Sequence, residues 1–166
     1  MVITQPEQLG EFELKALRSE ILDAFADLES LICSFLKDAR LSSKASHFGA
    51  RVEAFKMIEG ITRIAKANYS KRDRLAEDIA GLLPIRADIV HSRMRICVID
   101  GFPAAIFVNS QNKSEAFPPR RILTADELGT MCSKILHIVA ELGTLQRVSN
   151  PASSPPPPSP AAATAP

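Results

Sequence analysis

The apolar residues between Leu14 and Phe35 recur every three or four positions, as they do on one face of an amphipathic helix. Acidic side chains occupy many of the positions between them. The spacing predicts a long helix, and its repeat of about 3.5 residues is typical of helices that pack nearly antiparallel in a left-handed bundle. Such a helix needs partner helices, in this chain or in a second copy.

Three further segments in the first two-thirds of the chain carry a helical pattern. A second helix is predicted over residues 47–67, where large apolar side chains again repeat at helical spacing. A short helix is predicted over residues 75–83 and is expected to end before Pro84, because proline suits the first turn of a new helix. That new helix is predicted over residues 85–93.

The pattern then changes to short β-branched runs. Residues 94–99 and 104–108 form two such runs, joined through Asp100-Gly101-Phe102-Pro103. An Asp-Gly pair between β-branched runs is a strong signal for a tight hairpin turn. We therefore predict a β-hairpin inserted between helices, followed by a polar, turn-rich segment over residues 109–121.

The end of the chain combines a helix with a proline-rich tail. Thr124 and Glu127 form a capping box, which predicts that the last helix starts there and continues to about residue 147. Seven of the 12 prolines lie within residues 151–166, where no charged residue remains. Such a segment cannot bury apolar surface and is predicted to be disordered. We expect one folded domain over residues 1–148 and a tail over residues 149–166.

Composition narrows the class of protein further. The net charge of +1 gives no general attraction to nucleic acid, but residues 63–95 hold eight Lys or Arg against four Asp or Glu. The three cysteines are far apart and form no zinc-ligand pair, which favours a reducing compartment. The chain has no apolar run long enough to span a membrane, and its first residues lack the basic stretch and apolar stretch that are expected of a secretory leader. We expect a cytoplasmic protein that binds no membrane.

The candidate chemistry lies on the helix predicted over residues 85–93, where Arg86, Asp88 and His91 stand among apolar residues. Arg86 and His91 lie about 140° apart around a helix and can flank a groove, while Asp88 is close enough to orient His91 or Arg86. A histidine transfers protons near neutral pH, and a guanidinium suits phosphate oxygens. Each residue also has a structural alternative. Arg86 could pair with an acidic residue such as Glu20 or Glu53, Asp88 could stabilise the start of the helix, and His91 could pair with Asp88 or a backbone carbonyl at its end.

An arginine followed, after four residues, by a histidine on a helix of a mostly helical domain resembles the Arg-x4-6-His motif of the HEPN superfamily. The resemblance implies an all-α, HEPN-like four-helix bundle here carrying the hairpin, a homodimer with two motifs across a shared cleft, and cleavage of an RNA substrate without a metal or other cofactor. The catalytic pair it implies is Arg86 and His91. Beside that pair, Asp88 and Ser92 are the expected supporting residues, and Arg93 and Arg95 are expected to extend a basic rim that binds RNA.

Three functions stay open at this point. The first is an endoribonuclease, which the resemblance associates with toxin or defence systems and with a cognate antitoxin or regulatory protein. The second is a non-catalytic HEPN-like dimer that binds a nucleotide, RNA or a partner protein; Ala87 favours it, because many catalytic members have a polar residue after the arginine. The third is a helical adaptor that recruits a partner through its first helix and its tail.

The other basic residues and histidines have simpler interpretations. His47 and His137 have no metal ligand at suitable spacing and are expected to be structural. Solvated loop charges are the expectation for five cations, namely Lys71, Arg72, Arg74, Arg120 and Arg121.

Overall fold

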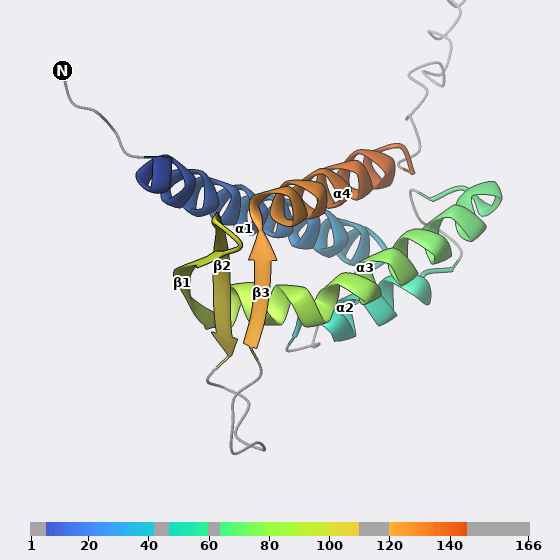
Figure 1. The fold of residues 1–166 in the computed structure, drawn as a ribbon. Coiled ribbons are helices and arrows are strands. Elements are labelled where there is room, and N and C mark those ends of the chain that lie inside the picture. Colours follow the sequence, from blue (N-terminus) through green and yellow to red (C-terminus); the bar gives the residue numbers. More distant parts are fainter. Residues whose placement is uncertain (1–5, 42–46, 60–63, 110–119, 146–166) are drawn as a thin grey trace, which may run out of the picture.

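The computed structural model describes residues 6–41, 47–59, 64–109 and 120–145 (Figure 1). In this part of the chain it consists mostly of helix, with four α-helices and a three-stranded antiparallel sheet. The tail predicted over residues 149–166 lies outside the described residues.

The longest helix, α1 (Pro6–Asp38), confirms the helix predicted over residues 14–35 and extends it at both ends. Five of the seven predicted apolar positions are buried, and the other two, Leu17 and Leu31, are half-buried. Just beyond its end, Arg40 adopts a positive φ of 55°. The amide of Leu41 then donates to the carbonyl of Leu36 at 3.0 Å, which satisfies one of the free carbonyls in the last turn of the helix.

The second helix is much shorter than predicted. α2 (Phe48–Lys56) covers only the first part of residues 47–67, and a 3₁₀ turn, η1 (Lys66–Asn68), lies at the end of that segment. His47 is structural, as expected, because its Nδ1 accepts a hydrogen bond of 3.2 Å from the amide of Ala50 and so caps α2.

A buried arginine explains where α2 ends. Arg72 donates through Nη1 to the carbonyl of Ile58, a group that a continuing helix would have bonded to its own backbone. The same side chain is only 5% exposed, donates through Nε to Asp73 at 2.8 Å, and lies over the ring of Tyr69. The expectation that Arg72 is a solvated loop charge is therefore wrong.

One continuous helix, α3 (Tyr69–His91), replaces the two helices predicted on either side of Pro84. Pro84 lies inside it and has no amide hydrogen, so the carbonyl of Ala80 loses its helical donor, at a cost of about 3 kcal/mol. Leu82 and Ile89, on either side of the proline, are both buried in the core. Each such burial is worth about 1.5 to 3 kcal/mol, enough together to offset the broken hydrogen bond.

The hairpin is confirmed as β1 (Ser92–Ile99) and β2 (Phe102–Asn109), paired in antiparallel register. Asp100 and Gly101 form its turn with φ of 52° and 84°, the positive values that a two-residue turn of this kind needs. A third strand, β3 (Arg120–Thr124), was not predicted. It pairs with β2, which gives the sheet order β1-β2-β3.

The last helix, α4 (Ala125–Gly143), begins at the predicted capping box. The amide of Glu127 donates to the hydroxyl of Thr124 at 3.3 Å, and the amide of Thr124 donates to the carboxylate of Glu127 at 2.8 Å. In Figure 1, α4 lies along α1, α2 lies beside α3, and the sheet lies where α1 begins and α3 ends. Gly10 of α1 packs so closely on Pro103 of β2 that a β-carbon there would overlap the proline ring.

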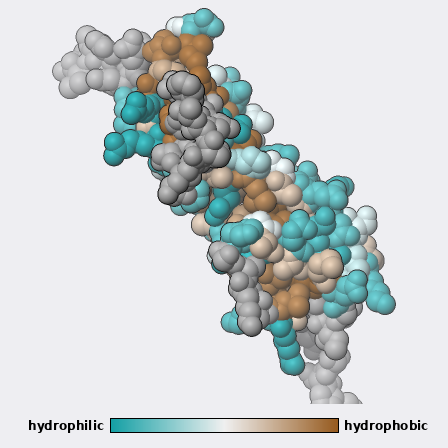
Figure 2. All heavy atoms as spheres, turned by 90° about the horizontal axis from the view of Figure 1, so that it is seen from below, coloured by the Kyte–Doolittle hydropathy of each residue, from teal (hydrophilic) through white to brown (hydrophobic). Residues whose placement is uncertain are grey.

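One hydrophobic core joins the helices and the inner side chains of the sheet. Apolar surface also remains exposed: Figure 2 shows a face on which hydrophobic and hydrophilic patches alternate. Near the hairpin turn, Val98 and Phe102 are 58% and 71% exposed. Among the helices that the structure describes, none is both long and apolar enough to cross a membrane.

Candidate functional site

The candidate site lies at the junction where α3 ends and β1 begins. His91, the last residue of α3, is exposed, whereas Ser92, the first residue of β1, is buried. Side chains alternate along the strand, so Arg93 and Arg95 are exposed while Met94 packs against the core. The side chains of His91, Arg93 and Arg95 make no hydrogen bond or ion pair with any other described residue.

An arginine from α1 holds this junction together. Nη2 of Arg18 donates to the carbonyl of Ile89 and to the carbonyl of Ser92, each at 3.3 Å. These carbonyls lie on either side of His91 in the chain, and the positive charge offsets the partial negative charge at the end of α3. The Oγ atom of Ser92 is buried without a partner in the described part of the chain. No sequence pattern indicated this role for Arg18, which lies more than 70 residues from its acceptors.

Arg86 has a partner that sequence reasoning did not identify. Its Nη2 donates to Oε2 of Glu29 on α1 at 3.0 Å, so the partner is neither Glu20 nor Glu53. Its guanidinium also lies 5.0 Å from the ring centre of Phe48. The structure shows no hydrogen bond between Arg86 and His91, although it describes both residues. Arg86 therefore faces α1 and α2 rather than the exposed end of its helix.

Asp88 ties α3 to the sheet. Nε of Arg121 on β3 donates to Oδ2 of Asp88 at 2.7 Å, and the aspartate side chain is only 17% exposed. This pairing differs from the expected hydrogen bond with His91 or Arg86. Arg121 lies in β3 and forms an ion pair with Asp88. The expectation that it is a solvated loop charge is therefore wrong.

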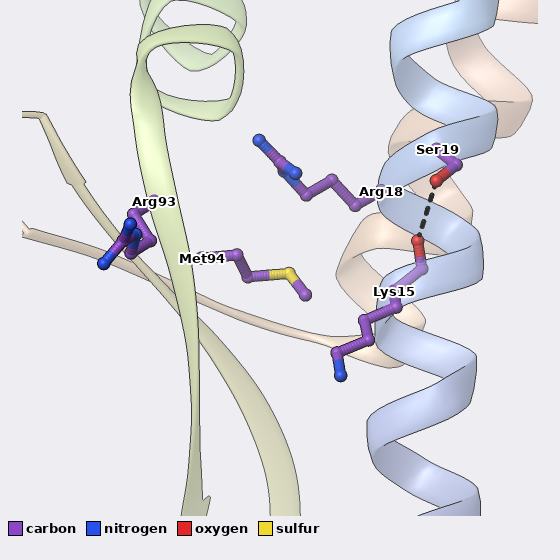
Figure 3. Close-up of a pocket in the computed structure, with 5 residues that line it drawn as sticks. All are labelled: Lys15, Arg18, Ser19, Arg93 and Met94. Carbon is purple, nitrogen blue, oxygen red and sulfur yellow. Dashed lines mark hydrogen bonds between the residues drawn. The ribbon is translucent and has the colours of Figure 1, made fainter.

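A groove lies beside the junction, between α1 and β1, with a volume of about 510 Å³. Figure 3 shows Arg18 and Met94 reaching toward each other across it, with Arg93 on the other side of the β1 strand from Met94. Lys15 and Ser19 complete the lining from α1. Three of the five lining residues are cationic and none is acidic, so the groove favours an anion.

Two groups with shifted pKa values lie on α4. Lys71 donates to Glu141 at 2.6 Å, and this hydrogen bond and positive charge lower the pKa of the carboxyl below its ordinary value. Lys71 also donates to the hydroxyl of Thr144 at 2.9 Å, so it is not a solvated loop charge. Burial, assisted by the charge of Glu20, raises the pKa of the Cys132 thiol and keeps it protonated.

No metal ligands converge at the junction. Within the described ranges, no three or more His, Cys, Asp or Glu side chains are grouped so that they could hold a metal ion. A scan of protein-family models and searches of curated proteins and of solved structures give no match to this chain.

Proposed function

We propose that this protein is a metal-independent endoribonuclease of HEPN type, with His91 in its active site. The observation that carries the proposal is the position of His91, exposed beside an anion-favouring groove and next to a strand that presents Arg93 and Arg95. An imidazole has an ordinary pKa of about 6.5 and can transfer a proton near neutral pH. The four helices support a HEPN-like bundle, and the Arg-x4-His spacing supports the reaction class.

The proposed reaction is an internal transfer at a backbone phosphate. A base takes the proton of a 2′-hydroxyl, and the 2′-oxygen forms a bond to phosphorus. The bond from phosphorus to the 5′-oxygen breaks, and an acid protonates that oxygen, which leaves a 2′,3′-cyclic phosphate and a 5′-hydroxyl. His91 suits either proton transfer, and a homodimer would supply a second His91 for the other. Exposed arginines would stabilise the charge that develops on the phosphate.

Within one protomer, Arg86 and Asp88 are proposed to position the helix that carries His91. The ion pair of Arg86 with Glu29 joins α3 to α1, and the ion pair of Asp88 with Arg121 joins α3 to β3. Both fix the helix whose last residue is His91. For Arg86 to contact a phosphate directly, as the motif implies, its ion pair with Glu29 must open.

The second candidate is a non-catalytic dimer that binds RNA, a nucleotide or a partner protein. The Arg86–Glu29 ion pair favours it, because this guanidinium already has a carboxylate acceptor. Ala87, in place of a polar residue, points the same way. A role in toxin or defence systems, with a cognate antitoxin or regulatory protein, rests on the resemblance alone.

Cleavage in the presence of excess EDTA separates the two candidates. The purified protein is incubated with RNA of mixed sequence, and the 3′ ends of the products are analysed. His91→Ala is compared with His137→Ala, which removes the exposed histidine of α4. Products with cyclic phosphate ends, lost only in His91→Ala, support the ribonuclease. RNA binding without cleavage by the wild type supports the binding protein, and cleavage that survives His91→Ala contradicts the assignment of the site.

A further inference from the structure

The groove between α1 and β1 has the chemistry of a phosphate site. Lys15, Arg18 and Arg93 contribute three positive charges, and the hydroxyl of Ser19 lies in the same lining. No Asp or Glu belongs to that lining, although acidic residues are common on α1. Cations gathered without acids attract anions, and both lysine and arginine are common ligands of phosphate groups.

Two of the three cations are available to a ligand. Arg93 has no partner among the described residues. Lys15 pairs with Glu11 one helical turn away, but their side chains are 60% and 46% exposed, and an ion pair so open to water holds its partners weakly. Arg18 is different, because its hydrogen bonds to two backbone carbonyls fix its guanidinium in place. The groove therefore combines one fixed charge with two adaptable ones.

The position of the groove connects it with His91. Arg93, on its rim, is two residues after His91, and Arg95 lies on the same exposed face of β1, about 7 Å further along the strand. Positive charge therefore continues from the groove along the exposed face of β1. A strand of nucleic acid that passes His91 could place one phosphate in the groove and the next ones along β1.

We propose that this groove binds a phosphate group that neighbours the scissile one, with Lys15 as its mobile ligand and Arg18 as its fixed charge, and that Arg93, on the rim, contacts the adjoining phosphate. The assignment to RNA rests on the proposed function. The same chemistry would accept the phosphates of a free nucleotide, so the experiment includes both sources.

The test measures equilibrium binding at several salt concentrations. The probes are a single-stranded 2′-O-methyl oligonucleotide, which lacks the nucleophilic hydroxyl and stays intact, and a nucleoside diphosphate. Lys15→Gln/Arg93→Gln is compared with Lys66→Gln/Arg74→Gln, which removes the same two charge types from exposed positions. Arg74 is about 25 Å along α3 from His91.

We expect the groove variant to bind the oligonucleotide about tenfold more weakly than the wild type at low salt. The slope of the logarithm of the binding constant against the logarithm of the salt concentration should become shallower by about 1.4, the value for two lost phosphate contacts. The control variant should stay within about twofold of the wild type, because its charges lie far from the groove. Equal losses in both variants, or no binding of either probe by the wild type, would overturn the groove assignment. Loss of nucleotide binding alone would support the groove and identify a free nucleotide as its ligand.

RNA cleavage is measured on the same proteins, so the two claims fail separately. If binding depends on the groove residues but no RNA is cleaved, the phosphate site is supported and the ribonuclease proposal is contradicted. If the groove variant cleaves and binds RNA as well as the wild type does, the ribonuclease proposal stands and the phosphate-site proposal is contradicted.

Discussion

The guanidinium of Arg86 on α3 donates a 3.0 Å hydrogen bond to the carboxylate of Glu29 on α1. The same carboxylate forms an ion pair with Arg51 on α2, so three helices meet at one negative charge. All three side chains are about a quarter exposed. Arg86 therefore joins helices, whereas Arg93 and Arg95 of β1 have no partner among the described residues and are open to a phosphate.

Glu29→Gln should destabilise the protein, because it removes the negative charge that pairs with two partly buried guanidinium groups. We expect the free energy of unfolding to fall by about 1 to 3 kcal/mol, measured by urea denaturation. The control is Asp27→Asn, which removes an exposed acid from the same helix. Equal small effects of the two substitutions would show that the ion pairs of Glu29 do not hold the helices together.

Arg18→Gln should loosen the junction that carries His91. The variant loses charged hydrogen bonds to the carbonyls of Ile89 and Ser92, with an expected loss of about 1 to 3 kcal/mol of stability. Amide hydrogen exchange should accelerate at the end of α3 and the start of β1. Lys15→Gln, which removes an exposed charge three residues earlier, should leave both measurements unchanged. Unaltered exchange in Arg18→Gln would contradict the proposed clamp.

Local patterns predicted those parts of the fold that local interactions determine. Three features depend only on residues that are close in sequence: the apolar repeat of α1, the turn at Asp100-Gly101 and the capping box before α4. The end of α2 depends instead on Arg72, which reaches the Ile58 carbonyl from another helix. β3 begins with two arginines and has only two large apolar residues, too weak a pattern to predict a strand.

The candidate site shows the same division. Alternation along β1 puts Arg93 and Arg95 on one face, but this was not predicted, because residue 93 was assigned to the preceding helix. The partners of Arg86 and Asp88 lie 57 and 33 residues away in sequence, where many charged residues compete for each pairing. Only the packing of α1 and β3 against α3 selects among them. For the same reason the groove lining from α1 could not be predicted.

The ion pair between Lys71 and Glu141 should make stability depend on pH. Because Lys71 lowers the pKa of Glu141 in the folded state, the pair stabilises the fold above the unfolded pKa of about 4.3. That contribution disappears as the pH falls through the folded pKa. The melting temperature of Lys71→Gln should therefore lie below that of the wild type at pH 7 and approach it in acid. A difference that persists unchanged at pH 2 would contradict the ion pair as its source.

Arg40→Gly should stabilise the protein. Arg40 has a φ of 55°, a conformation that costs a residue with a β-carbon about 1 kcal/mol or more and glycine much less. Glycine also has greater conformational freedom in the unfolded chain, which offsets part of this stabilisation. We therefore expect the free energy of unfolding, measured by chemical denaturation, to rise by about 0.5 kcal/mol. Lys37→Gly, inside the last turn of α1, should instead lower the free energy of unfolding. A loss of stability in both variants would contradict the strain at Arg40.

The most direct test of the central claim is the single-turnover rate of cleavage of one defined RNA, measured in EDTA across neutral pH. The account predicts that His91→Ala lowers this rate by about 100-fold or more, because a proton-transfer group is lost. His137→Ala should cleave at the wild-type rate, and both variants should retain their fold and oligomeric state. If His91→Ala cleaves the RNA as fast as the wild type does, the active site does not lie at the junction of α3 and β1.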